Sequence, residues 1–256
     1  MGYRCRELDN VYTINELSTV LCYPSRELTC AIRRCVELGL LGIRTLCLGG
    51  GSEVYGKRIV GKGTTALVVK GFLRGEPVAV KIRRTDANRF SLLHEAKILE
   101  KIKGTNIGPE LLASSRNFLV WRFIEGLDFA DWLQGINSRE ELQETFHKIL
   151  YKLYLLDTIG IAHNELSRPF NHVIIDPWKR EPYIIDFESA SVSSRRSNLA
   201  QFMGYFLGEW SHLPEKLSKN LMLDSSKIQK IRFLLREYKN EREMRLVEEI
   251  NEILFS

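Results

Sequence analysis

Two acidic residues stand beside short apolar segments in the second half of the chain. Glu165 comes shortly before the apolar segment 173–175, and Asp186 comes directly after the apolar segment 183–185. These segments predict two strands joined by a turn at 176–181, and pairing them as a hairpin brings both acids to the same end. Carboxylates gathered in this way can hold a divalent ion and orient an attacking hydroxyl, which are the requirements of phosphoryl transfer.

A second candidate site lies earlier, where glycines and a lysine occur among predicted strands. The string Gly61-Lys62-Gly63-Thr64 precedes an apolar strand, so its backbone can approach a polyanion closely. An ordinary turn is an equally good interpretation of this string taken alone. Lys81 follows within another apolar strand, where a lysine must either reach the surface or meet an anion. Glu95, on the next predicted helix, is the expected partner of Lys81, with Glu100 as the less well-placed alternative.

The elements that would position these residues fall into two groups. Strands are predicted within 57–83 and over 117–126, with one helix over 90–102 between them. Mostly helices follow, including a long one that Ser138 caps and that ends before Gly160. The sequence therefore predicts a β-rich lobe and a helix-rich lobe, joined at 125–128, with a ligand cleft between them.

The first part of the chain predicts a smaller module. Two helices over 13–38 and a glycine-rich hairpin resemble a winged helix-turn-helix. Arg26, Arg33 and Arg34 are expected on its exposed side, where they would favour contact with nucleic acid or a ribonucleoprotein. A small helical packing domain that binds no nucleic acid is the alternative.

Composition narrows the class of protein. The chain has 256 residues, of which 44% are hydrophobic and 27% charged, and its net charge is +5. These values are typical of a globular protein, and no apolar run is long enough for a membrane span. No secretory signal is recognisable, so we expect a soluble, cytoplasmic protein without membrane partners.

The cysteines all lie near the N-terminus. There are five, at positions 5, 22, 30, 35 and 47. An odd number without a signal peptide argues against a disulfide framework, so buried thiols are expected, with a zinc site as the alternative.

Taken in order, these patterns resemble the protein-kinase fold over residues 57–190. The strings are G-K-G-x-x-A-x-V, V-A-V-K, a helix glutamate, L-V-W-R-F-I-E-G, H-N-E-L and I-I-D-F-E. The details are most similar to atypical kinases of the RIO-related branch and to archaeal predicted Ser/Thr kinases. The resemblance implies an α+β, two-lobed kinase-like fold preceded by a winged-helix-like domain. It divides the chain into an N-terminal domain (1–56), an N-lobe (57–125) and a C-lobe (126–256).

The resemblance also implies an activity and a set of site residues. The activity is transfer of the γ-phosphoryl group of ATP to a Ser or Thr hydroxyl of a protein, the enzyme itself included, with Mg²⁺ or alternatively Mn²⁺. Catalytic roles fall to Glu165, Asp186, Lys81 and Arg168. Nucleotide binding falls to Gly61, Lys62, Gly63, Thr64, Val68, Ala79, Lys81, Glu95, Trp121, Arg122, Phe123, Ile124 and Asp128. Metal binding falls to Asp186 with either Asn171 or His172.

Two departures from the family keep other interpretations open. Glu165 stands where the family has Asp, and the loop after it is longer than in the family. We interpret the extra methylene of Glu165 as compensating for the longer loop, so that the carboxylate still reaches the position that the family Asp occupies. Glu188 replaces the glycine of D-F-G. A small-molecule kinase on the same fold and an ATP-binding pseudokinase or ATPase-like switch are the alternatives to a protein kinase.

Overall fold

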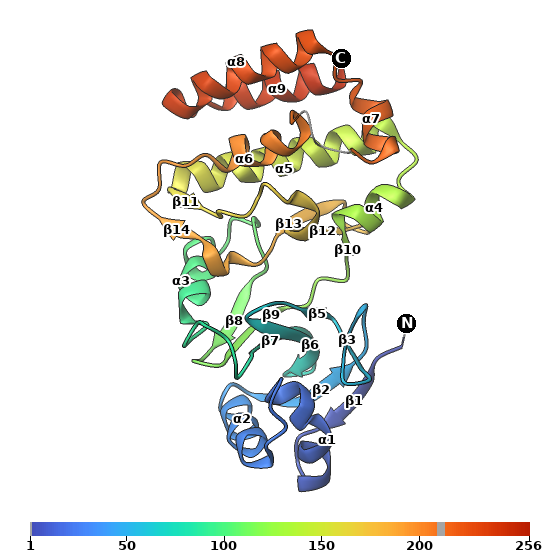
Figure 1. The fold of residues 1–256 in the computed structure, drawn as a ribbon, viewed down its shortest axis with the longest axis vertical. Coiled ribbons are helices and arrows are strands. Elements are labelled where there is room, and N and C mark those ends of the chain that lie inside the picture. The colour runs from blue at the N-terminus through green and yellow to red at the C-terminus, as the bar shows by residue number, and fades with distance from the viewer. Residues whose placement is uncertain (1, 209–212) are drawn as a thin grey trace. The chain divides into compact units, whose positions relative to one another are not determined.

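The structure is a computed structural model that describes residues 2–208 and 213–256. It is a mixed α+β protein, as the sequence predicted, and its elements fall into two compact units (Figure 1). Unit 1 comprises residues 1–103 and 109–124, and unit 2 comprises residues 104–108 and 125–256. Within the described ranges, no helix is long and apolar enough to cross a lipid bilayer.

Unit 1 combines a pair of N-terminal helices with a large antiparallel sheet. Its helices are α1 (Val11–Leu21), α2 (Leu28–Leu40) and α3 (Leu93–Lys101). Its strands are β1 (Arg4–Glu7), β2 (Ile43–Leu48), β3 (Ser52–Val54), β4 (Lys57–Ile59), β5 (Gly61–Lys62), β6 (Ala66–Leu73), β7 (Glu76–Arg83), β8 (Leu111–Ser114) and β9 (Phe118–Arg122).

The sheet of unit 1 runs continuously from the N-terminal strands to the strands predicted for the N-lobe. Its order is β1-β2-β6-β7-β9-β8, with β5 added beside β6. Strands are confirmed within 57–83, where β6 and β7 pair as an antiparallel hairpin with Leu73 opposite Glu76 at its turn. Strand β7 pairs with β6 on one side and β9 on the other, so Lys81 lies on an interior strand.

One hydrophobic core holds unit 1 together. Leu17 of α1 and Leu38 of α2 are fully buried in the same cluster as Val80 of β7 and Phe118 of β9. Burial of such side chains stabilises a fold by about 1.5–3 kcal/mol each. Residues 1–56 therefore pack against the same sheet as residues 57–122, and the assignment of residues 1–56 as a domain of their own stays a prediction.

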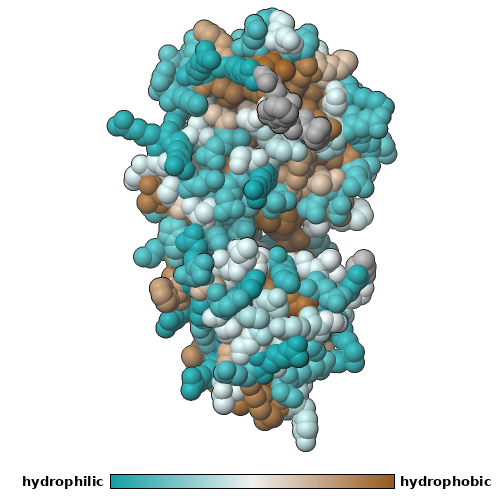
Figure 2. Space-filling view, viewed as in Figure 1, coloured by the Kyte–Doolittle hydropathy of each residue, from teal (hydrophilic) through white to brown (hydrophobic). Residues whose placement is uncertain are grey.

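Helix α2 differs from its predicted orientation. The guanidinium of Arg34, expected at the surface, is buried and donates to the carbonyl oxygen of Leu21. The apolar side chains of Ile32, Val36 and Leu40, at the i, i+4, i+8 spacing of one helix face, are exposed instead. Figure 2 shows apolar surface over the N-terminal helices. Arg26 and Arg33 are exposed as expected, but the expectation is wrong for Arg34, because packing rotates α2 so that Ala31, Arg34 and Leu38 face inward.

The expectation of five free thiols is also wrong. Cys5 of β1 lies directly opposite Cys47 of β2 and is bonded to it, and Cys22 is bonded to Cys30 across the turn between α1 and α2. Cys35 is the free cysteine of the described residues, and it is buried. The pairing follows from strand register and from the helix turn, neither of which the cysteine count reveals.

Unit 2 is mostly helical. Its helices are α4 (Phe129–Gly135), α5 (Arg139–Ile159), α6 (Asn198–Phe206), α7 (Glu215–Leu221), α8 (Ser225–Glu241) and α9 (Met244–Phe255). Its short strands are β10 (Leu127–Asp128), β11 (Ile161–Ala162), β12 (Val173–Asp176), β13 (Glu181–Ile184) and β14 (Ser191–Val192), with 3₁₀ turns η1 (Pro169–Asn171) and η2 (Phe187–Ser189).

Several predictions for unit 2 are confirmed. Ser138 caps α5 by accepting from the backbone N–H of Glu141, and Gly160 ends it with a left-handed backbone. Strands β12 and β13 pair as a hairpin, with Val173 opposite Ile184. Glu209 and Trp210, at the end of the helical segment predicted after residue 196, lie outside the described residues.

A glycine marks the entry of the chain into unit 2. A Cβ at Gly126 would lie 2.7 Å from the carbonyl oxygen of Ile175 and 2.5 Å from a methyl carbon of Ile174. Only glycine allows the backbone to approach β12 this closely.

Candidate functional site

In unit 1, Lys81 and Glu95 form a buried ion pair. The Nζ of Lys81 on β7 lies 2.7 Å from Oε2 of Glu95 on α3, and the two residues are 6% and 3% exposed. Removing two charges from water is costly unless they meet each other. Lys81 therefore has the partner that the sequence suggested, while its role toward a nucleotide stays a prediction.

The glycine string of unit 1 forms a tight hairpin between β5 and β6. The N–H of Gly63 donates to the carbonyl of Ala66 at 2.8 Å, and Gly61 lies opposite Val68. Thr64 is exposed at the tip. The carbonyl of Gly63 accepts from the Arg84 guanidinium at 3.0 Å, which ties the loop to the end of β7.

The remaining nucleotide-binding candidates lie on β7, on β9 and just after β9. Ala79 is buried on β7 opposite the half-buried Trp121 of β9. Arg122 is exposed and pairs with Glu110 at 3.2 Å. The N–H of Phe123 donates to Pro77 at 3.2 Å, and the half-buried Ile124 ends unit 1.

Asp128, which the resemblance assigned to nucleotide binding, caps a helix in unit 2. Its Oδ1 accepts from the backbone N–H of Asp131 at 2.8 Å, at the start of α4. This carboxylate therefore satisfies an otherwise unpaired amide of the first helical turn.

Within unit 2, the loop before β12 is bound to the residue that precedes Asp186. The ring Nε2 of His163 lies 2.9 Å from the carbonyl oxygen of Ile185, and the N–H of Ile185 donates to the carbonyl of His172 at 3.0 Å. Burial lowers the pKa of His163 to about 4, so its ring is neutral at pH 7 and Nε2–H donates to Ile185. These bonds bring the loop of Glu165 and the Asp186 backbone together at one end of the β12–β13 hairpin.

The polar side chains of that loop differ in exposure. Glu165 has a side chain that is 43% exposed, and its Oε2 lies 3.4 Å from Nε2 of the buried His172. Arg168 is exposed, and so is Asn171 in η1. The Nδ1 of His172 is buried and has no hydrogen-bond partner among the described residues.

Asp186 has a backbone conformation that non-glycine residues rarely adopt. Its φ is +65°, in the left-handed region, directly after the residues that follow β13. Such a conformation is strained, and it is found most often where function requires a side chain to point in a particular direction.

A second carboxylate lies beside Asp186. Oxygen atoms of Asp186 and Glu188 lie within 4.8 Å of one another, and both residues are half-buried. Two hard oxygen donors at this separation suit a divalent cation such as Mg²⁺. Sequence reasoning treated Glu188 only as a replacement for glycine, although its Asp-x-Glu spacing on a tight turn was the available signal.

The loop is anchored by a buried asparagine that sequence reasoning did not single out. Asn198, the first residue of α6, accepts from the N–H of His163 at 2.8 Å and donates to the carbonyl of Ile161 at 2.7 Å. Its side chain also donates to Asp157 at 2.7 Å. Asn198 therefore fixes the strand that leads into the loop of Glu165.

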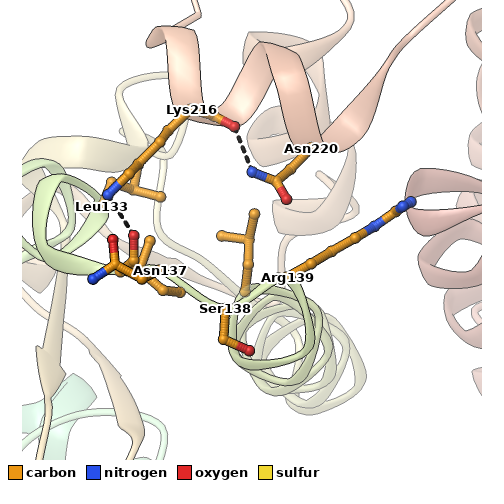
Figure 3. Close-up of a pocket in the computed structure, with 8 residues that line it drawn as sticks. Leu133, Asn137, Ser138, Arg139, Lys216 and Asn220 are labelled. Carbon is orange, nitrogen blue, oxygen red and sulfur yellow. Dashed lines mark hydrogen bonds between the residues drawn. The ribbon is translucent and has the colours of Figure 1, made fainter.

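A separate cavity of unit 2 lies where α4, α5 and α7 meet (Figure 3). Its volume is about 150 Å³, below the roughly 300–1,000 Å³ of ordinary small-molecule sites. Lys216 crosses it and donates to the carbonyls of Gln134 and Ile136, so the ammonium is already bonded. This cavity does not favour a metabolite-binding site.

Comparison with known protein families and with curated proteins gives no match for this chain.

Proposed function

We propose that the protein is an ATP-dependent phosphotransferase that transfers a γ-phosphoryl group to a Ser or Thr hydroxyl of a protein. The observation that carries the proposal is the arrangement at one end of the β12–β13 hairpin. There, Asp186 has a strained backbone, lies next to Glu188 and follows a residue bonded to the loop of Glu165. The order of the sequence strings supports the same activity.

In this proposal, unit 1 provides the residues that position the nucleotide. The buried Lys81 ammonium, oriented by Glu95, would bind the phosphates as a fixed positive charge. The hairpin at Gly61–Gly63 would cover the phosphates with backbone amides. Such positioning is the main contribution of a protein to phosphoryl transfer.

Unit 2 would provide the acids. Asp186 and Glu188 would hold a Mg²⁺ ion, which would neutralise charge on the transferred phosphate. Of the two further ligand candidates, we favour Asn171, because its amide is exposed whereas His172 is buried and faces Glu165. Glu165 would accept the proton of the attacking hydroxyl, and Arg168 would contact the γ-phosphate.

Glu165→Asp tests our interpretation that the longer Glu165 side chain compensates for the longer loop that follows it. Because Asp is one methylene shorter, it would no longer reach His172, now 3.4 Å from the Glu165 carboxylate. We expect phosphorylation to fall about tenfold or more. Full activity of Glu165→Asp would show that the longer side chain does not compensate for the longer loop.

The first test of the activity is incubation of the full chain with γ-labelled ATP and Mg²⁺, with a general protein acceptor present. Asp186→Asn preserves shape but removes the negative charge, so we expect incorporation of label to fall at least about 100-fold. Asp131→Asn, on the exposed side of α4, makes the same chemical change and should retain activity.

The other outcomes separate the alternatives. Label on a metabolite but not on protein would favour a small-molecule kinase, although the cavity beside Lys216 does not support one. ATP binding without transfer or hydrolysis would favour a pseudokinase. Equal label incorporation by Asp186→Asn and the native protein would contradict the proposed role of Asp186.

A further inference from the structure

Unit 1 contains arginines that lie close together without acidic partners. Arg83, at the end of β7, donates from Nε to Oδ1 of Asn117 at 3.0 Å and from Nη1 to the carbonyl of Arg89 at 3.3 Å. Arg116, next to Asn117 in the β8–β9 turn, donates from Nε to the carbonyl of Phe90 at 3.2 Å. Both guanidiniums are therefore held by neutral acceptors on the same two loops.

Arg34 adds a third, buried charge. Its guanidinium is buried on α2, where burial and, next, the charge of Arg83 lower its pKa to about 10. Burial and then the charge of Arg116 lower the pKa of Arg83 in the same direction. The charge of Arg83 thus acts on Arg34, and the charge of Arg116 acts on Arg83.

The nearby carboxylates leave this positive charge uncompensated. Within the described part of the chain, no acid forms an ion pair with Arg34, Arg83 or Arg116. The charge of Glu37 raises the pKa of Arg34 and of Arg83, but its carboxylate accepts from Ser115 Oγ at 2.5 Å and from the backbone and side-chain nitrogens of Asn117 at 3.1 and 2.8 Å. Three arginines and one glutamate leave a local charge near +2.

We propose that this cluster, Arg34, Arg83 and Arg116, is a docking site for a phosphorylated polypeptide segment. A phosphate monoester carries about −1.5 to −2 charges at pH 7, which matches the excess charge of the cluster. Guanidiniums held in fixed positions bind such oxyanions with short, charge-assisted hydrogen bonds. Arg83 and Arg116 would contact the phosphate, and the buried Arg34 would add to the field.

Two features favour a polypeptide over a nucleic acid. Arg83 and Arg116 both donate to the loop that follows β7, whereas a nucleic acid is bound by charges spread along its backbone. Phe90, whose carbonyl accepts from Arg116, has an 82% exposed side chain, and Leu93 is 42% exposed. Exposed apolar side chains beside the cluster would pack against residues next to the phosphorylated one.

The test is fluorescence anisotropy of the full chain with a labelled phosphoserine peptide that has an apolar residue after the phosphate, beside its unphosphorylated twin. We expect the phosphopeptide to bind at least about tenfold more tightly than the twin. Arg116→Ala should weaken phosphopeptide binding about tenfold, and adding Arg83→Gln should weaken it further. Arg44→Ala, which removes an exposed arginine of β2, is the matched control and should change affinity less than about twofold.

The same assay contains the outcomes that would overturn the proposal. Equal affinity for the two peptides would show that the cluster does not recognise the phosphate. Equal losses of phosphopeptide affinity in Arg116→Ala and Arg44→Ala would show the same. Inorganic phosphate should compete only weakly, since it lacks the apolar contacts, and competition as strong as that of the phosphopeptide would indicate a free-anion site instead. If a single-stranded oligonucleotide binds as tightly as the phosphopeptide and its affinity falls in Arg116→Ala, the surface is a nucleic-acid-binding site instead.

Discussion

The ion pair of Lys81 and Glu95 affects the stability of the fold as well as the proposed activity. Both side chains are almost fully buried, and their charged atoms lie 2.7 Å apart. The loss of one partner leaves the other as a desolvated charge, whereas loss of both does not. The interaction between the two residues is therefore measured by comparing the stability of the double variant with that of each single variant.

Lys81→Met should lower the free energy of unfolding by about 3–5 kcal/mol, because it removes the ammonium that lies 2.7 Å from the buried Glu95 carboxylate. The double variant Lys81→Met/Glu95→Leu should recover much of this loss. Urea unfolding followed by circular dichroism measures both, and Lys97→Met on the exposed side of α3 is the control, expected within about 0.5 kcal/mol of the native protein. A double variant that loses the sum of the two single losses would show that the residues do not stabilise each other.

The free cysteine gives a second prediction for single residues. Burial raises the pKa of Cys35 to about 11 from its ordinary value of 9.0. Because the thiolate is the reactive form, its fraction at pH 8 falls about 100-fold, and burial slows attack further. Iodoacetamide should therefore modify the native protein at least about 100-fold more slowly than a free cysteine.

Counting the modified sites tests the disulfides in the same experiment. In denaturant without reductant, mass spectrometry should find one modified cysteine, and after reduction it should find five. Five modified cysteines without reductant would instead agree with the thiols that the composition suggested.

The contact between α5, α6 and the loop of Glu165 depends on one buried network. Asp157, near the end of α5, accepts from the backbone and side-chain nitrogens of Asn198, from Ser197 Oγ and from the Tyr238 hydroxyl. Burial raises the pKa of Asp157, while these hydrogen bonds lower it. Asn198 transmits this anchoring to the backbone of His163.

Asn198→Ala should lower the free energy of unfolding by about 3 kcal/mol. It removes the side-chain partner of the His163 N–H and of the Ile161 carbonyl, together with one of the hydrogen bonds to Asp157. Hydrogen exchange should also become faster at the His163 amide, which donates to Asn198. Asn137→Ala, at an exposed asparagine before α5, should change neither quantity. Unchanged protection of the His163 amide would show that Asn198 does not hold the loop.

The two units have opposite charge balances. Unit 1 contains 20 of the 37 Lys and Arg residues but only 11 of the 32 Asp and Glu residues, whereas unit 2 has more acids than bases. The mild net charge of +5 therefore conceals a strongly basic unit. Such a unit attracts anionic ligands, which agrees with both the proposed nucleotide contacts and the arginine cluster.

Local patterns were sufficient for the class of fold and for many elements. Two apolar segments and the turn between them predicted the hairpin β12–β13, and Ser138 and Gly160 predicted the ends of α5. These features depend on residues close together in the sequence, so their physical causes can be read from short segments. The pairing of Lys81 with Glu95 was anticipated by the order of one strand and one helix.

Only the tertiary structure determined the features that depend on contacts between residues far apart in the sequence. The rotation of α2 buried Arg34, and the pairing of β1 with β2 placed Cys5 opposite Cys47. The contacts of Asn198 with His163 and of Arg83 with Asn117 each join residues more than 30 positions apart. No local pattern specifies such contacts, because they arise only when the whole core selects one arrangement of its elements.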